Sequence, residues 1–88
     1  MFIELDLDGG IVILNINHII AIEISDGYET TIHGDPLCTS VIISTSESVY
    51  NTYYRKTFSY NDGLSKQQAF EYFEKLSKML NAKKEEKY

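Results

Sequence analysis

The feature that most constrains this chain is a pair of apolar segments joined by a tight turn near its amino terminus. Apolar and acidic side chains alternate over residues 2–7, which is the period of a half-buried β-strand. An Asp-Gly-Gly sequence follows at residues 8–10, and such sequences supply the positive-φ positions that tight hairpin turns need. Residues 11–16 are then almost entirely apolar. We therefore predict that residues 2–16 form a β-hairpin.

Further segments have the composition of strands. Residues 19–25 and 39–45 are rich in isoleucine and other β-branched residues, and residues 52–60 are rich in tyrosine and phenylalanine. Residues 28–38 contain a Gly-Asp-Pro sequence, which interrupts extended structure. We predict that this segment is a long loop with room for one short edge strand.

The last third of the chain has the pattern of an amphipathic helix. Ser65 is a good N-cap residue, and Gln68 three residues later completes a capping box. Apolar side chains then recur at helical spacing, at Ala69, Phe73, Leu76 and Leu80. The fold class that we predict is α+β, mostly β, with a five- to six-stranded antiparallel sheet that is curled or closed into a small barrel and one C-terminal amphipathic helix. We expect one domain over residues 1–83 and a disordered tail over residues 84–88.

The two segments at 11–16 and 19–25 are apolar on both faces. One face of the second segment carries three isoleucines: Ile20, Ile22 and Ile24. Its other face begins with Ile19. Because one helix cannot cover both sides of a sheet, the remaining isoleucines require either a curled sheet or a second subunit. We therefore predict a homo-oligomer.

Charge and composition exclude several classes of protein. The 88 residues suit a single domain, and their net charge is −5. Residues 1–60 hold eight acids and only two bases, so this region repels phosphate backbones and argues against nucleic-acid binding. No apolar run is long enough to span a bilayer, so we expect no membrane association. A single cysteine and the lack of a signal-peptide pattern indicate a cytoplasmic protein.

Few residues suggest metal or catalytic chemistry. His33, Asp35 and Cys38 lie close together in the predicted loop and are potential metal ligands, or a Cys–His nucleophile pair. Their spacing matches no standard zinc pattern, and a second ligand pair is missing. Asp6 and Asp8 resemble the start of a calcium loop, but the later ligands are absent and a hairpin turn explains both acids. We predict no metal, no cofactor and no enzymatic activity.

One basic and aromatic cluster lies in the β-region. It consists of Tyr53, Tyr54, Arg55, Lys56 and Tyr60. Three interpretations stay open: a strand with one face packed under the helix, a protein interface anchored by tyrosine and arginine, or a surface that stacks single-stranded bases.

The amino-terminal third resembles the small FlbD-type proteins associated with bacterial flagella. The residues that carry the resemblance are Ile3-x-Leu5-x-Leu7-Asp8-Gly9-Gly10 and Leu14-Asn15-x-Asn17-His18-Ile19-Ile20-x-Ile22-Glu23. The resemblance implies a strand, a glycine turn and a leucine–asparagine step that leads to a third strand. Relative to the family's pattern, residues 27–38 resemble an inserted segment. The family brings no catalytic residues, so the resemblance carries fold rather than function.

These observations lead to one function and two alternatives. The leading hypothesis is a non-enzymatic protein-interaction module of bacterial or phage origin that forms homo-oligomers and binds a further protein partner of unknown identity. The first alternative is an acidic protein that binds a small ligand or inhibits a basic partner. The second is a single-stranded nucleic-acid binder that uses the last strand.

Overall fold

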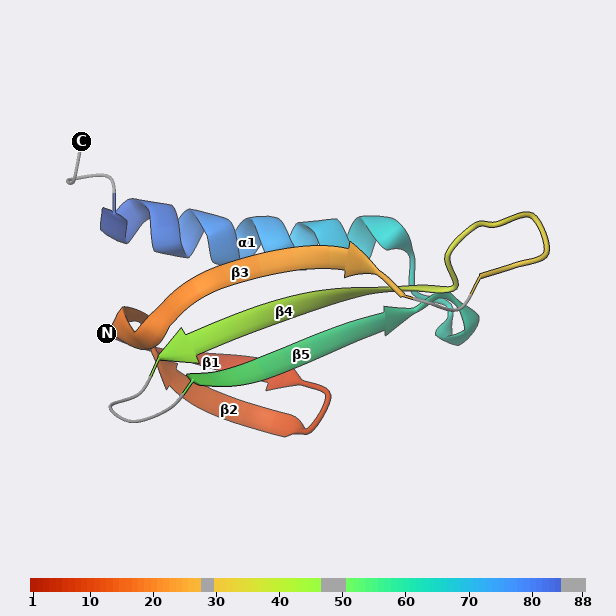
Figure 1. The fold of residues 1–88 in the computed structure, drawn as a ribbon. Coiled ribbons are helices and arrows are strands. Elements are labelled where there is room, and N and C mark those ends of the chain that lie inside the picture. The colour runs from red at the N-terminus through yellow and green to blue at the C-terminus, as the bar shows by residue number, and fades with distance from the viewer. Residues whose placement is uncertain (28–29, 47–50, 85–88) are drawn as a thin grey trace.

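A computed structural model describes residues 1–27, 30–46 and 51–84 of the chain (Figure 1). Its elements, in chain order, are β1 (Phe2–Leu7), β2 (Gly10–Asn15), β3 (Ile19–Asp26), β4 (Cys38–Ser46), β5 (Asn51–Ser59) and α1 (Lys66–Lys84), with short 3-10 helices at Ile16–His18 and Tyr60–Asp62. The tail predicted for residues 84–88 lies outside the described residues, apart from Lys84, where the helix ends.

The α+β class, the antiparallel strands and the single C-terminal helix are confirmed. Within the described residues there are five strands and not six, and they form two sheets, β1–β2 and β3–β4–β5. Of the two alternatives, a curled sheet or a small barrel, the barrel is wrong, because no ladder in the described part of the chain joins the two sheets into a closed ring. Residues 28 and 29 of the predicted loop lie outside the described residues, and in its described part, residues 30–38, extended pairing before β4 consists of one isolated bridge between Thr30 and Pro36. Proline cannot donate to a ladder, which explains why pairing stops there.

The first hairpin forms as predicted. Gly10 adopts a φ of 127°, a conformation that glycine reaches without strain, and Leu7 pairs with it across the turn. The register places Ile3 opposite Leu14 and Leu5 opposite Val12. Side chains on this inner face are buried or half-buried, so the hairpin contributes one wall of the core.

A β-bulge corrects the alternation that we expected in β3. The ladder with β4 shifts between Ile19 and Ala21, so Ile19 lies opposite Thr45 while Ile22 lies opposite Ile43. Ile19 is therefore buried on the core side, and the extra residue, Ile20, is 53% exposed.

The helix begins and packs as the sequence predicts. The backbone N–H of Ser65 donates to Oε1 of Gln68 at 2.8 Å, and the N–H of Gln68 donates to Oγ of Ser65 at 3.4 Å. The apolar stripe of α1 packs across β3, β4 and β5, with Leu76 among the buried core residues and Phe73 half-buried beside them. No helix in the described part of the chain is long and apolar enough to cross a membrane.

The core lies between three walls: α1, one face of the β3–β4–β5 sheet and the inner face of the hairpin, which runs beside β5 (Figure 1). Val41 and Ile43 of β4 are fully buried on the side that faces α1. The opposite side of the same sheet has no covering element among the described residues. We call it the open face.

Candidate interaction surfaces

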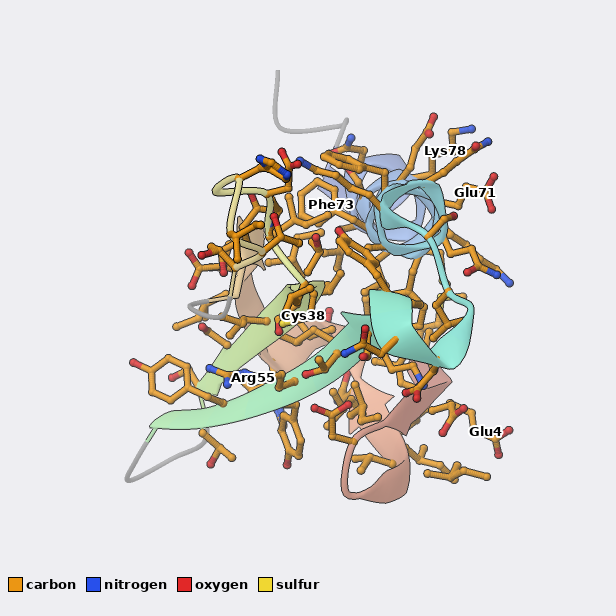
Figure 2. All side chains as sticks on the ribbon, turned by 90° about the vertical axis from the view of Figure 1, so that its right-hand side faces the viewer. Glu4, Cys38, Arg55, Glu71, Phe73 and Lys78 are labelled. Carbon is orange, nitrogen blue, oxygen red and sulfur yellow. The ribbon has the colours of Figure 1, made fainter. Side chains whose placement is uncertain are left out.

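The register of the three-stranded sheet fixes which side chains share the open face. One row across the sheet consists of Glu23, Ile42 and Arg55 from β3, β4 and β5. The next rows are Ala21–Ser44–Tyr53 and Ser25–Ser40–Thr57. Arg55 lies on the side of the sheet away from α1 (Figure 2). The open face is therefore largely made of small side chains, with larger ones along β5.

A shallow hollow of about 610 Å³ lies on this face, towards the end of the sheet where β3 ends and β4 begins. Small or hydroxyl-bearing side chains line much of it, among them Ser25, Cys38, Ser40, Thr57 and Ser59. Ile42, Arg55 and Asn61 complete the lining on the β4–β5 side. The hollow exists because short side chains on the central strand leave the sheet surface uncovered.

Two opposite charges share the open face without meeting. Glu23 and Arg55 are both exposed, and neither takes part in an ion pair among the described residues. Two strand spacings of about 4.8 Å separate them, which exceeds ion-pair distance at the backbone level. The nearby Asp26 is already compensated, since Lys66 Nζ lies 3.7 Å from its carboxylate and the Thr39 hydroxyl donates to it at 3.2 Å.

The structure divides the predicted basic and aromatic cluster between two sides of the sheet. Tyr53 and Arg55 lie on the open face, whereas Tyr54 and Lys56 lie on the covered side. Lys56 Nζ is 3.5 Å from the Asp6 carboxylate and 5.7 Å from the centre of the Phe58 ring.

Tyr60 lies just beyond β5, where its hydroxyl is in hydrogen-bond contact with the Thr39 hydroxyl. The five side chains of the cluster therefore do not form one continuous surface. Base stacking on the open face would have to rely on Tyr53.

The predicted loop residues are also separated. The backbone N–H groups of His33 and Asp35 both donate to the Thr31 hydroxyl at 3.2 Å, which shapes a turn with exposed side chains. Cys38 lies at the start of β4, where its Sγ packs so closely on Gly27 that a Cβ there would collide with it. Within the described ranges, no three His, Cys, Asp or Glu side chains gather closely enough to hold a metal ion.

The outer face of the β1–β2 hairpin is a second exposed surface. Phe2, Ile11 and Ile13 are 67%, 69% and 64% exposed, and we call these three side chains the hairpin patch. Across the ladder Asp6 lies opposite Ile11 and Glu4 opposite Ile13, so two carboxylates are interspersed with the apolar groups. Ile11 and Ile13 belong to the apolar segments for which the sequence analysis found no covering element, and in the structure they are exposed.

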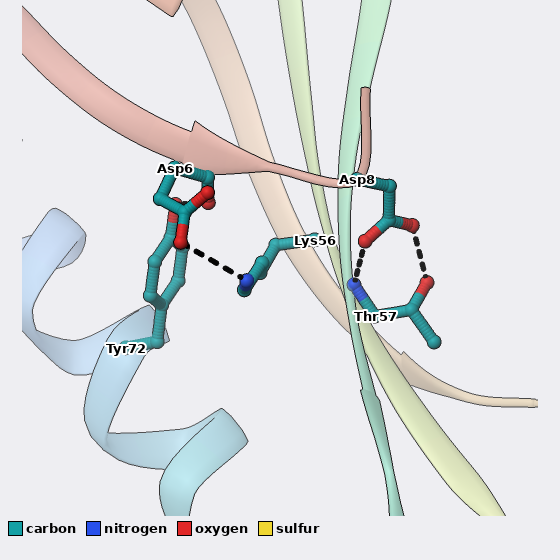
Figure 3. A network of polar contacts seen from close by, with 5 residues as sticks. All are labelled: Asp6, Asp8, Lys56, Thr57 and Tyr72. Atoms are coloured by element: carbon teal, nitrogen blue, oxygen red, sulfur yellow. Dashed lines mark hydrogen bonds and ion pairs between the residues drawn. The ribbon is translucent and has the colours of Figure 1, made fainter. Parts of the chain in front are cut away.

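A contact that sequence reasoning missed holds the hairpin to the three-stranded sheet. The two carboxylate oxygens of Asp8 accept from Thr57, one from its backbone N–H at 2.8 Å and the other from its hydroxyl at 2.7 Å (Figure 3). The N–H of Asp8 donates in turn to the carbonyl of Arg55 at 2.9 Å. Forty-nine positions separate Asp8 from Thr57, and no local pattern in the sequence points from one to the other.

The hairpin is also joined to the helix. Tyr72 reaches from α1 to Asp6 of β1 (Figure 3), where its hydroxyl donates to the backbone carbonyl of Asp6 at 3.3 Å. Its ring packs edge-on against Phe58, with 5.5 Å between the ring centres. Burial raises the pKa of the Tyr72 phenol, and the negative charges of Asp6 and Asp8 raise it further. Neutral Tyr72 is thus favoured at this junction.

Comparison of the chain with models of protein families, with curated proteins and with solved structures finds no match. The similarity to FlbD-type proteins therefore stays a prediction, and the function has to be argued from the surfaces themselves.

Proposed function

We propose that this chain is a non-enzymatic protein-interaction module that acts as a homo-oligomer and holds a further protein partner on its hairpin patch. The observation that carries the proposal is the exposure of Phe2, Ile11 and Ile13 on one face of a hairpin whose other face is in the core. Contiguous exposed apolar groups rimmed by polar ones are typical of protein contact sites, where a few large side chains supply most of the binding energy.

The charges around the hairpin patch indicate the chemistry of the partner. The outward-facing positions of β1 and β2 include Glu4 and Asp6; Asp6 is paired with Lys56 of β5, whereas Glu4 takes part in no ion pair among the described residues. The chain as a whole has a net charge of −5, which steers basic surfaces towards it. A partner that presents apolar side chains next to lysine or arginine would match both properties of this face.

The proposal is tested by removing the apolar groups of the patch without disturbing the core. The double variant Ile11→Ser/Ile13→Ser changes two exposed side chains, and Phe70→Ser changes a 47% exposed side chain on α1 as a matched control. Quantitative pull-down from the native host should recover a partner with the wild type and the control, and at least tenfold less with the double variant. Equal recovery with all three proteins would overturn the proposal.

A second candidate function, binding of a small ligand, is favoured by the hollow on the open face. A volume of about 610 Å³ lies within the range of small-molecule sites, and hydroxyl groups and Arg55 could orient a polar ligand. Native mass spectrometry of the purified chain would show a retained molecule as a discrete mass increase. An unmodified mass under gentle conditions would count against this candidate.

A further inference from the structure

We infer that the open face is the surface on which two copies of this chain meet, face to face, about a two-fold axis that runs along β4. The inference rests on the proposed homo-oligomeric function, and it names the surface and the symmetry through which the copies associate. It begins from the row in which Glu23 and Arg55 flank Ile42.

A two-fold axis along the central strand reverses the order of the outer strands in the second copy. The β3 strand of one subunit then faces the β5 strand of the other, and residues of the same row keep the same position along the strand direction. Glu23 therefore comes to lie opposite Arg55 of the partner subunit, and Arg55 opposite the partner's Glu23, while Ile42 meets its own copy. The two charges without partners in one chain become two ion pairs between chains, which is the self-complementarity that a two-fold interface requires.

The sizes of the side chains match in the same arrangement. Tyr53, which is 69% exposed, stands opposite Ala21 of the partner subunit in the neighbouring row. In the row beyond, Thr57 stands opposite the partner's Ser25. Larger residues on β5 thus face smaller residues on β3, as close packing of two sheets requires.

Other arrangements of two copies lack this complementarity. A two-fold axis across the strands, centred on the same row, would put Glu23 opposite the partner's Glu23 and Arg55 opposite the partner's Arg55. Pairing through the hairpin patch would bring together two surfaces in which Asp6 is already paired with Lys56 of its own chain, while Glu4 takes part in no ion pair among the described residues. Like charges disfavour both arrangements. Among these surfaces, the open face alone carries both signs at positions that a two-fold axis exchanges.

The extent of the face sets the expected strength of association. Three strands spaced about 4.8 Å apart and about 27 Å long present roughly 400 Å² per subunit. The total of about 800 Å² falls below the roughly 1,200 Å² of stable interfaces, which indicates a weak dimer with a Kd of about 10–100 μM. The shallow hollow adds to this weakness, since short side chains leave room for water between the sheets.

Charge reversal on the intact chain tests the geometry directly. The variants Glu23→Arg and Arg55→Glu change exposed side chains that form no ion pair among the described residues, so both are expected to fold. Each variant alone would place like charges opposite each other at two positions, and sedimentation equilibrium should show association at least tenfold weaker than in the wild type. An equimolar mixture would place an acid opposite a base at both positions, so a 1:1 heterodimer should form with a Kd close to that of the wild type.

Two controls separate this geometry from a general effect of charge. Glu71→Arg and Lys75→Glu make the same changes in net charge on exposed positions of α1 and should leave association unchanged. Circular dichroism of each variant checks that the fold persists.

The outcomes distinguish failure of the inference from failure of the proposed function. Association of the single variants with wild-type affinity would overturn the open-face geometry while leaving a homo-oligomer in place. Failure of the mixture to associate would also overturn it. A wild type that stays monomeric at about 500 μM would overturn both the dimer and the homo-oligomeric part of the proposed function, since that concentration exceeds the expected Kd. Partner capture on the hairpin patch is measured separately and is not affected by these results.

Discussion

Two neighbouring isoleucines show how differently the two faces of one sheet are used. Ile43 is completely buried under α1, whereas Ile42, the residue before it, faces the other way and is half-buried on the open face. Both lie on the central strand, so each has a neighbouring strand on either side. The difference between them comes only from what covers each face. It indicates that the covered face serves stability and that the open face is available for contact.

The largest predicted change in stability should come from truncating the two isoleucines to alanine. Ile43→Ala removes methyl groups from the centre of the core and should lower the free energy of unfolding by about 2–5 kcal/mol. Ile42→Ala makes the same chemical change at a half-buried position on the open face and should lower it by about 1 kcal/mol or less. Urea denaturation of both variants measures the two losses.

The pair is internally controlled, because both variants lose the same β-branched side chain from the same strand. Any difference between them therefore reports burial rather than strand propensity. In sedimentation the order should reverse, with Ile42→Ala weakening self-association and Ile43→Ala having little effect below its unfolding transition. Equal losses of stability would contradict the assignment of the covered face.

The strands and the helix could be predicted because their signals are local. Alternation over residues 2–7, the glycine turn and the capping box of Ser65 with Gln68 each lie within a few positions, and the structure has all three. The bulge at Ile20 could not be predicted, since a ladder shift depends on the partner strand. The closed barrel was a wrong expectation because strand order is set by contacts distant in the sequence.

A smaller effect is expected where the hairpin is joined to the edge of the sheet. Asp8→Ala removes an acceptor that holds both the N–H and the hydroxyl of Thr57, and should cost about 1–2 kcal/mol of stability. Asp6→Ala removes one ion pair with Lys56, in which the Asp6 side chain is 75% exposed, and should cost less than about 1 kcal/mol. Thermal and urea unfolding of the two variants give the comparison.

Hydrogen exchange would show whether the Asp8 contact joins the two sheets. In Asp8→Ala the amide of Thr57 should exchange faster, because it loses its acceptor, while the amides within the β3–β4 ladder should keep their protection. Asp8→Asn retains one acceptor oxygen and should fall between the wild type and Asp8→Ala. Unchanged exchange at Thr57 in Asp8→Ala would contradict the contact.

The candidate surfaces were harder to predict than the fold. Tyr53, Tyr54, Arg55 and Lys56 are consecutive, and a strand necessarily sends alternate side chains to opposite faces. The sequence could show that these residues alternate but not which face α1 would cover. The placement of Glu23 and Arg55 on either side of Ile42 depends on strand register, which the local sequence does not fix. Exposure of the hairpin patch likewise follows from where the hairpin docks.

The smallest predicted effect concerns Tyr72, which helps to close the covered side between helix and hairpin. Tyr72→Phe removes the 3.3 Å hydrogen bond to Asp6 and should cost about 0.5–1 kcal/mol of stability at neutral pH. Burial, with the charges of Asp6 and Asp8, raises the pKa of Tyr72 in the folded chain, so the unfolded chain loses this proton first as pH rises above about 10.

Stability of the wild type should therefore fall more steeply with pH in that range than stability of Tyr72→Phe, so the advantage of the wild type should shrink as the pH rises above about 10. The two proteins differ only at residue 72, so the difference between their stability curves isolates the contribution of this side chain. Urea denaturation at several pH values measures the two curves. Parallel curves above pH 10 would show that Tyr72 titrates alike in the folded and unfolded chains, and that the carboxylates at the hairpin do not act on it.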